Sequence, residues 1–300
     1  MWFVQTPIFN FRAILRAALI FKGIYMHTLA IIGAGNMGAS LLGGLIANQF
    51  PGERIWITDS DPEKLRTLKQ QFNVHTTDNN EEAANAADIV ILALKPQIMR
   101  EATRKLATVS QAKKSLIISI AAGIREEDLQ DWLGGNVAIV RCMPNTPALI
   151  RAGATALYAN HFVTAKQRDL AESILRAVGT AIWLDNEKHM DAVTALSGSG
   201  PAYFFLMIEA LQAAGEKLGL ASETARLLTL QTALGAARMA LESNESAAEL
   251  RRRVTSPGGT TEAALRVLEK ANITELFFNA LKTAKERSEE LADTFGKEVK

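Results

Sequence analysis

The chain has 300 residues, and 48% of them are hydrophobic, so it can bury a sizeable core and is expected to form two domains. Lys and Arg number 33 against 32 Asp and Glu, which gives a formal net charge of +1. No block of basic residues stands out, so a nucleic-acid partner is not indicated. The single cysteine, Cys142, excludes an intrachain disulfide and is predicted to be a small buried residue and not a nucleophile.

Residues 1–25 have an unusual composition. They contain Arg12, Arg16 and Lys22, no acidic residue and many large apolar side chains. These charges interrupt every apolar run well before the ~18 residues that a membrane span needs. A targeting or membrane-surface segment is one interpretation. We favour an extension outside the fold, with the first domain starting at residue 26, and no membrane partner is expected.

A glycine-rich turn then follows an apolar run. Leu29 to Ile32 predict a short buried strand, and Gly33, Gly35 and Gly38 interrupt the pattern before apolar residues recur at helical spacing. The first glycine permits a tight turn, the second lets the backbone approach a pyrophosphate, and the third lets the helix pack on the strand. Because the helix N-terminus favours phosphate, the pattern predicts dinucleotide binding. A tight turn that binds nothing is the alternative.

Strands and helices continue to alternate along the chain. A helix is predicted over residues 62–71, with Asp61 as its cap and Pro62 in its first turn. Further strands are predicted over residues 54–59, 88–94, 115–123 and 136–141. Continuous apolar runs such as these are typical of a parallel sheet that is buried on both faces.

Residues that follow the carboxyl ends of such strands line the ligand crevice of a parallel sheet. Lys95, residues 121–123 and Asn145 occupy such positions, so we expect them to meet a cofactor. Each also has an ordinary interpretation as a solvated charge or a turn.

From about residue 188 the pattern becomes helical, with long helices predicted over 201–218, 222–241 and 260 to the C-terminus. The domain boundary is predicted near Asn186. Residues 202–208 are apolar on nearly every side, so this helical domain is expected to pack against a second copy of itself.

A second glycine-rich segment, Ser256 to Glu262, precedes the last pair of helices. Gly258 and Gly259 free the backbone, and the N–H groups of Gly259, Thr260 and Thr261 open a helix. Such a helix start suits a carboxylate. A capping loop that binds nothing is the alternative.

Taken together, these motifs resemble those of the pyrroline-5-carboxylate reductase family in order and spacing. The resemblance runs from about Met26 to about Leu291, and the last motif is the most specific to that family. The motifs are Gly33–Gly38, Ala93–Pro96, Ala121–Gly123, Met143–Pro147, Ser197–Tyr203 and Ser256–Thr261.

The resemblance implies an α/β fold in which an N-terminal Rossmann-type doubly wound parallel sheet, residues 26–186, precedes an all-α substrate and dimerisation domain, residues 187–300. It implies an NAD(P)H-dependent oxidoreductase that reduces the C=N bond of 1-pyrroline-5-carboxylate to L-proline, the last step of proline biosynthesis. It also implies a cytoplasmic enzyme that forms homodimers, often assembled into decamers. No metal is expected.

The resemblance also implies roles for individual residues. Thr261 would face the ring nitrogen of the substrate as a positioning group and a member of a proton relay. The substrate-binding residues would be Ser256, Gly258, Gly259, Thr260 and Thr261. With the strand-end position Asn145, the expected cofactor-binding residues are Ile32, Gly33, Ala34, Gly35, Asn36, Met37, Gly38, Asp59, Asn80, Ala93, Leu94, Lys95, Pro96, Ile120, Ala121 and Ala122.

Asp59 departs from the family pattern, because many members carry small or basic residues after the second strand. A carboxylate there would accept hydrogen bonds from the adenosine ribose and would repel a 2′-phosphate by about 1 kcal/mol or more. Nothing basic is expected beside Asp59, since Lys64 and Arg66 fall on the next helix. NADP(H) is therefore the family expectation, and Asp59 makes NAD(H) possible. A loop aspartate that caps the next helix is the alternative.

Other functions remain as alternatives. A β-hydroxyacid dehydrogenase also joins a Rossmann domain to a helical one, but it carries a lysine four residues after the second glycine of a related motif. Counting from Gly200, that position here is Phe204, which cannot act as the base for alcohol oxidation. Another imine-reducing oxidoreductase is a further alternative. A non-catalytic nucleotide-sensing regulator would need the first glycine turn but not Ser256–Thr261.

Overall fold

The structure is a computed structural model that describes residues 25–296. It divides into two compact units: unit 1 holds the described residues up to Gly198 together with those from Lys285 onward, and unit 2 is Ser199–Ala284. The predicted extension lies outside the described residues, except for Tyr25. The Tyr25 ring packs 5.8 Å from that of Phe50, and its hydroxyl donates to the carbonyl of Asn48. Tyr25 is therefore part of the fold, contrary to the prediction.

Unit 1 is built on one sheet of eight strands in the order β3-β2-β1-β4-β5-β6-β7-β8. Neighbouring strands are parallel except β6 and β7, which are antiparallel. The predicted Rossmann-type sheet is confirmed. The strands are β1 (Leu29–Ile32), β2 (Ile55–Thr58), β3 (His75–Thr77), β4 (Ile89–Leu92), β5 (Leu116–Ser119), β6 (Ile139–Met143), β7 (Gly153–Ala159) and β8 (Gly179–Trp183).

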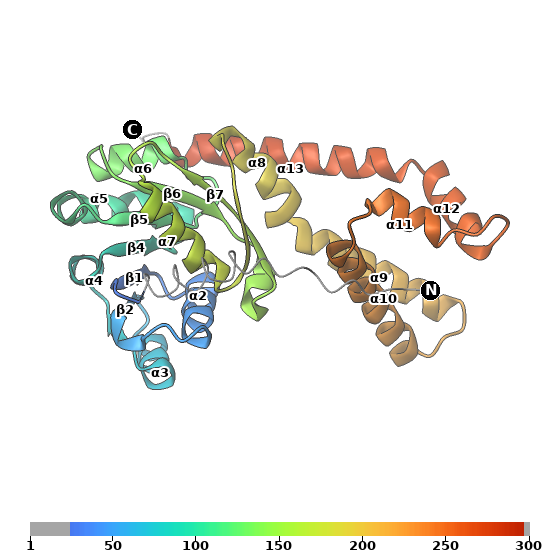
Figure 1. Ribbon diagram of the computed structural model, residues 1–300, viewed down its shortest axis with the longest axis horizontal. Helices are drawn as coiled ribbons and strands as arrows, with labels where there is room; N and C mark the ends of the chain where they lie inside the picture. The colour runs from blue at the N-terminus through green and yellow to red at the C-terminus, as the bar shows by residue number, and fades with distance from the viewer. Residues whose placement is uncertain (1–24, 297–300) are drawn as a thin grey trace. The chain divides into compact units, whose positions relative to one another are not determined.

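Helices cover both faces of this sheet (Figure 1). One face packs against α2 (Asn36–Ala47), α3 (Pro62–Phe72) and α7 (Ala165–Arg176), and the other against α4 (Asn80–Ala86), α5 (Pro96–Lys113) and α6 (Glu126–Leu133). Alternate residues of each strand enter opposite cores, because side chains of a strand point to opposite faces in turn. In β1, Leu29 and Ile31 join the first core, and Ala30 and Ile32 the second.

Local signals at the helix starts behave as expected. The Asp61 carboxylate accepts the N–H groups of Glu63 and Lys64 at the start of α3, which confirms the predicted cap. Pro96 is the first residue of α5, where its missing N–H costs no intrahelical hydrogen bond. Cys142 is buried, and this burial raises the pKa of its thiol, in agreement with a packing role.

A short connecting region follows the sheet. It contains a 3₁₀ turn (Glu187–His189), α8 (Met190–Val193) and one π-helical turn (Thr194–Gly198), and it clusters with unit 1, where Met190 and Ala195 are buried. The compact units therefore separate at Ser199, whereas the domain boundary was predicted near Asn186.

Unit 2 is helical throughout. α9 (Gly200–Lys217) packs against α10 (Ser222–Glu242), and these are followed by α11 (Ala247–Arg253), α12 (Thr260–Lys270) and the first part of α13 (Ile273–Gly296). The short helix α11 was not predicted. Many large apolar side chains of unit 2 are exposed in the single chain, for example Phe204 at 62%, Phe205 at 65% and Leu206 at 65%.

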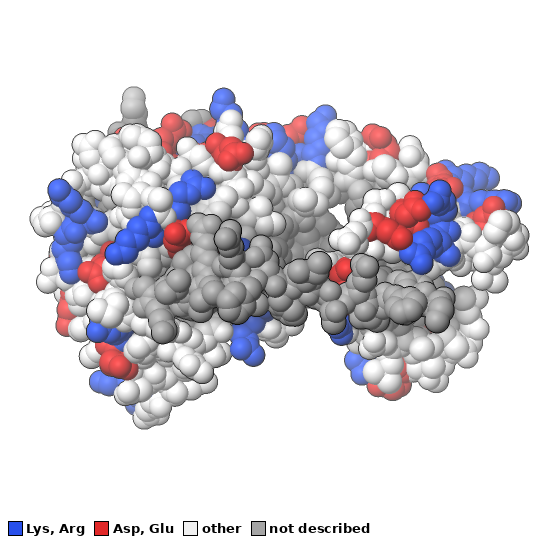
Figure 2. Space-filling view, viewed as in Figure 1, with Lys and Arg blue, Asp and Glu red and all other residues white. Residues whose placement is uncertain are grey.

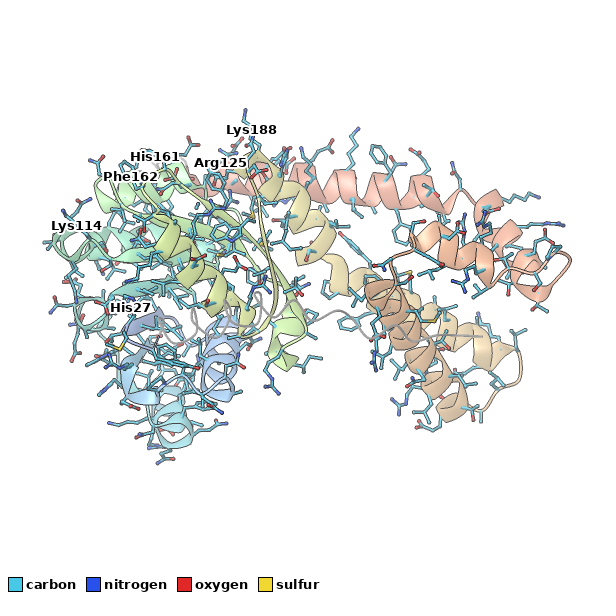
Figure 3. All side chains as sticks on the ribbon, in the orientation of Figure 1. His27, Lys114, Arg125, His161, Phe162 and Lys188 are labelled. Carbon is cyan, nitrogen blue, oxygen red and sulfur yellow. The ribbon has the colours of Figure 1, made fainter. Side chains whose placement is uncertain are left out.

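The last turns of α13 belong to unit 1. Ser288 donates to Asp191 at 2.6 Å, and Arg125, labelled in Figure 3, donates to Asp293 at 2.6 Å. Arg100 also donates to the carbonyl of Gly296 at 2.7 Å. These polar contacts fix the C-terminal end of the helix to the unit that contains the sheet.

Acidic and basic side chains are interspersed on the face drawn in Figure 2. Several acidic and basic side chains of unit 1 and unit 2 form pairs along one helix, such as Glu223 with Arg226 and Lys285 with Glu289. Exposed pairs of this kind contribute little to stability. Within residues 25–296, no helix is long and apolar enough to cross a membrane.

One ion pair of unit 1 joins a buried arginine to a partly buried glutamate. Arg141 on β6 has a side chain that is 3% exposed, and its Nη1 lies 2.7 Å from Oε1 of Glu187. The same oxygen accepts the N–H of Glu126 at 2.8 Å. Removing one partner of such a pair leaves a buried charge without compensation.

Glu187→Gln is therefore expected to lower the free energy of unfolding by about 3 kcal/mol. The matched control is Glu63→Gln, which breaks the exposed pair with Arg66 and should cost less than about 1 kcal/mol. Urea unfolding of both variants measures the difference. Equal losses would show that burial of Arg141 does not govern the energy of its pair.

Candidate functional site

The carboxyl ends of β2, β1, β4 and β5 lie in one row, and β6 crosses this row and ends two residues later, at Met143. The register pairs Thr58 with Ile32, Ile32 with Leu92, Leu92 with Ser119, and Ser119 with Arg141. Each chain segment that leaves this row therefore starts at the same edge of the sheet. The row brings together the segments that begin at Gly33, Asp59, Ala93, Ile120 and, two residues after the end of β6, Asn145.

The glycine turn at this edge leaves no room for side chains at two of its three positions. Gly33 has φ +104°, and a Cβ there would lie 2.7 Å from the carbonyl oxygen of Ala93. A Cβ on Gly38 would lie 2.1 Å from the carbonyl oxygen of Gly33. Gly35, the N-cap of α2, is exposed and has open space around its Cβ position. The open space and the helix N-terminus fit a pyrophosphate group.

The turn is held by the neighbouring strand. Gly33 donates its N–H to the carbonyl of Thr58 at 3.0 Å, and the Thr58 hydroxyl lies 3.3 Å from the same nitrogen. The Thr58 hydroxyl donates to Oδ1 of Asn80 at 2.6 Å. Asn80, a predicted cofactor residue, thus lies at the same edge of the sheet, and Thr58 is a supporting residue that the sequence analysis missed.

Asp59 supports the turn directly. Its carboxylate accepts the N–H of Ala34 at 3.0 Å and the N–H of Asp61 at 3.1 Å, and its Oδ2 lies 3.0 Å from Nζ of Lys64. Partial burial raises the pKa of Asp59, but the hydrogen bonds from Lys64 and from the two backbone N–H groups outweigh it, so the pKa lies below its usual value.

The expectation that nothing basic lies beside Asp59 is wrong. Lys64 is in the first turn of α3, and its side chain reaches back over the helix start to the carboxylate. The sequence signal that could have indicated this ion pair is the spacing of five residues between Asp59 and Lys64 across the capped start of α3. The alternative in which Asp59 caps this helix is also wrong, because Asp61 makes those hydrogen bonds.

The side-chain amide of Asn145 forms hydrogen bonds with other residues of the protein. Its Oδ1 accepts the N–H of Ala154 at 2.9 Å, and its Nδ2 donates to the carbonyl of Ser197 at 3.2 Å. The residue therefore ties the end of β6 to β7 and to the π-helical turn. Its position at the sheet edge is as expected, while its role towards a cofactor stays a prediction.

The segments after β4 and β5 contain the remaining predicted cofactor residues at this edge of the sheet. Lys95 is exposed and is the N-cap residue of α5, and Ala122 is exposed after β5. Gly123 has φ +71°, and a Cβ there would lie 3.2 Å from the Phe295 ring. Phe295, from the end of α13, thus supports the loop that contains Ile120–Ala122, a contact that no local sequence signal indicates.

The predicted substrate loop lies in unit 2. Gly258 has φ +70°, and its N–H donates to Oε2 of Glu262 at 2.7 Å. The N–H of Gly259 donates to the carbonyl of Ser256 at 3.0 Å, so the loop itself uses this predicted carboxylate donor. Thr260 and Thr261 are exposed in the first turn of α12, where N–H groups have no intrahelical acceptor.

The structure thus places the predicted cofactor residues together in unit 1 and the predicted substrate residues in unit 2. Among the described residues, no group of three or more His, Cys, Asp or Glu side chains is arranged to hold a metal ion. The strand order and the glycine turn define a dinucleotide-binding α/β protein.

Comparisons with known proteins narrow this class. Residues 187–291 match the family model for pyrroline-5-carboxylate reductase dimerisation, and residues 28–123 match that for NADP oxidoreductase coenzyme F420-dependent. The pyrroline-5-carboxylate reductase of Pseudomonas aeruginosa is 52% identical over 268 residues, which cover 89% of this chain and 98% of that protein.

Solved structures give the same result. A pyrroline-5-carboxylate reductase from Coxiella burnetii aligns with a TM-score of 0.86 at 50% identity, covering 88% of this chain and 98% of that one. The Plasmodium falciparum pyrroline carboxylate reductase with NADP bound aligns with a TM-score of 0.79 at 32% identity, covering 89% and 98%. The chain belongs to the pyrroline-5-carboxylate reductase family, and it is an NAD(P)-dependent oxidoreductase that acts on a C=N bond.

The glycine turn generates a prediction that separates folding from cofactor binding. Gly38→Ala is expected to destabilise the protein by about 2 kcal/mol, because its Cβ would collide with a backbone carbonyl. Gly35→Ala should cost less than about 1 kcal/mol, since open space surrounds it, yet it should weaken NADPH binding. Thermal unfolding and cofactor titration of each variant measure the two effects. Undiminished NADPH affinity in Gly35→Ala would contradict a pyrophosphate site at this turn.

Proposed function

We propose that the protein catalyses the NAD(P)H-dependent reduction of 1-pyrroline-5-carboxylate to L-proline, the last step of proline biosynthesis. The observation that carries the proposal is the match to the Pseudomonas aeruginosa reductase over 98% of that protein's length. The Ser256–Thr261 loop supports it, because this loop falls within the region that matches the reductase dimerisation family.

In the proposed site, unit 1 holds the cofactor. The N–H groups at the start of α2 bind the pyrophosphate, Asp59 and Asn80 lie towards the adenosine, and the segments after β4 and β5 line the nicotinamide half. The reduced nicotinamide supplies a hydride. The protein positions the reacting groups and excludes water, which is the main requirement of this chemistry.

In unit 2, the N–H groups of Thr260 and Thr261 bind the substrate carboxylate, helped by the positive end of the α12 dipole. Glu262 holds the preceding loop through the N–H of Gly258, and its charge is offset by Arg266 at 3.1 Å. The Thr261 hydroxyl faces the ring nitrogen. A protonated imine is already electrophilic, so a threonine that positions the ring is sufficient and no strong acid is required.

The direct test is to add 1-pyrroline-5-carboxylate to the purified protein with NADPH or NADH and to follow absorbance of the reduced nicotinamide. Oxidation that depends on the substrate and yields L-proline supports the proposal. A folded protein that binds the cofactor but shows no turnover with either one would contradict it.

Thr261→Ala is expected to lower turnover on the order of tenfold or more, because the hydroxyl that orients the ring is lost. NADPH affinity should stay within about twofold, since Thr261 is in unit 2 and the cofactor residues are in unit 1. Thr261→Ser, which keeps the hydroxyl, is the matched control. An equal loss of cofactor affinity and turnover in Thr261→Ala would contradict the assigned role.

We also propose that the helical unit forms a homodimer in the cytoplasm, which assembles further, up to a decamer. The match to the reductase dimerisation family and the exposed apolar side chains of α9 support a homo-oligomer. An apolar surface of this kind is stabilised when a second copy covers it.

Phe205, which is 65% exposed in the single chain, is therefore a suitable position for a test of assembly. Phe205→Glu is expected to lower the molar mass in light scattering, because a charge would be buried in the subunit contact. Leu149→Glu, in unit 1 and 59% exposed, is the control. An unchanged mass for Phe205→Glu would place the subunit contact elsewhere.

A further inference from the structure

The lysine that pairs with Asp59 has no role in the proposed reaction. The Lys64 side chain is 41% exposed, whereas that of Asp59 is 14% exposed, and their charged atoms lie 3.0 Å apart. Asp59 also accepts two backbone N–H groups, from Ala34 and Asp61, so three donors surround one carboxylate. Because the backbone N–H groups already provide hydrogen bonds to the Asp59 carboxylate, the main contribution of Lys64 is its positive charge.

This ion pair changes what an acidic residue after β2 implies about the choice between NADH and NADPH. Selection of NADH by such a residue depends on a carboxylate that is free to bind the ribose and to repel a 2′-phosphate. Here the carboxylate is engaged with the glycine turn, and the ammonium beside it cancels most of its field. The repulsion expected from Asp59 alone is therefore largely removed.

The other charged groups of this segment are also engaged. Asp61 caps α3 through the N–H groups of Glu63 and Lys64, and Glu63 pairs with Arg66. An ammonium has three N–H donors, of which Lys64 uses one on Asp59. Being partly exposed, it can direct the other two towards a phosphate without leaving its carboxylate.

We propose that Lys64 determines the choice between NADPH and NADH, by binding the 2′-phosphate while it neutralises Asp59. The inference rests on the proposed function only in taking the glycine turn as the dinucleotide site. In this proposal, Asp59 stabilises the conformation of the glycine turn by accepting the N–H of Ala34, and Lys64 sets the cofactor preference.

The test uses the full chain and two fragments without nicotinamide, adenosine 2′,5′-bisphosphate and adenosine 5′-monophosphate, titrated by calorimetry. The wild-type protein should bind the bisphosphate more tightly. Lys64→Gln should weaken bisphosphate binding about tenfold and leave the monophosphate within about twofold. Lys64→Arg should keep the preference. Lys69→Gln, an exposed lysine on the same helix, removes the same charge and should change neither fragment.

Several outcomes would overturn the inference. These are equal weakening of both fragments in Lys64→Gln, equal effects of Lys64→Gln and Lys69→Gln, or no preference for the bisphosphate in the wild-type protein. If Asp59→Asn raises the bisphosphate affinity by more than Lys64→Gln lowers it, Asp59 and not Lys64 determines the cofactor preference. Fragment binding does not involve turnover, so these failures are distinct from absence of reductase activity.

Discussion

The close approach of α2 to the turn that precedes it is the constraint on which the proposed cofactor site depends. A Cβ at Gly38 would lie 2.1 Å from the carbonyl oxygen of Gly33, so only glycine allows the helix to begin where it does. That position aims the first N–H groups of α2 at the edge where five strands end. The same edge receives the hydrogen bonds of Thr58 and Asp59, which fix the turn from the neighbouring strand.

Much of the fold could be predicted because its signals are local. Continuous apolar runs identified β1, β2, β4, β5 and β6, and Asp61 and Pro62 marked the start of α3. The strands that were missed are β3, β7 and β8. β3 is short and polar, and β8 is half exposed at the edge of the sheet, so neither produces a buried apolar run.

The candidate site was predicted less completely, because its details depend on contacts between distant residues. Sequence position identified Asp59 but not its ion pair with Lys64, which requires the side chain to fold back over a helix start. Support of Gly123 by Phe295 joins residues far apart in the chain. Asn145 was placed at the correct edge, yet its hydrogen bonds to Ala154 and Ser197 depend on β7 and on the π-helical turn, which were not predicted.

In the proposed mechanism, unit 1 binds the cofactor and the Ser256–Thr261 loop of unit 2 binds the substrate. A structure of the protein with NADPH and L-proline tests this division most directly. We expect the pyrophosphate at the N-terminus of α2 and the proline carboxylate at the N–H groups of Thr260 and Thr261. A carboxylate bound by residues of unit 1, with α12 making no contact to it, would contradict the division.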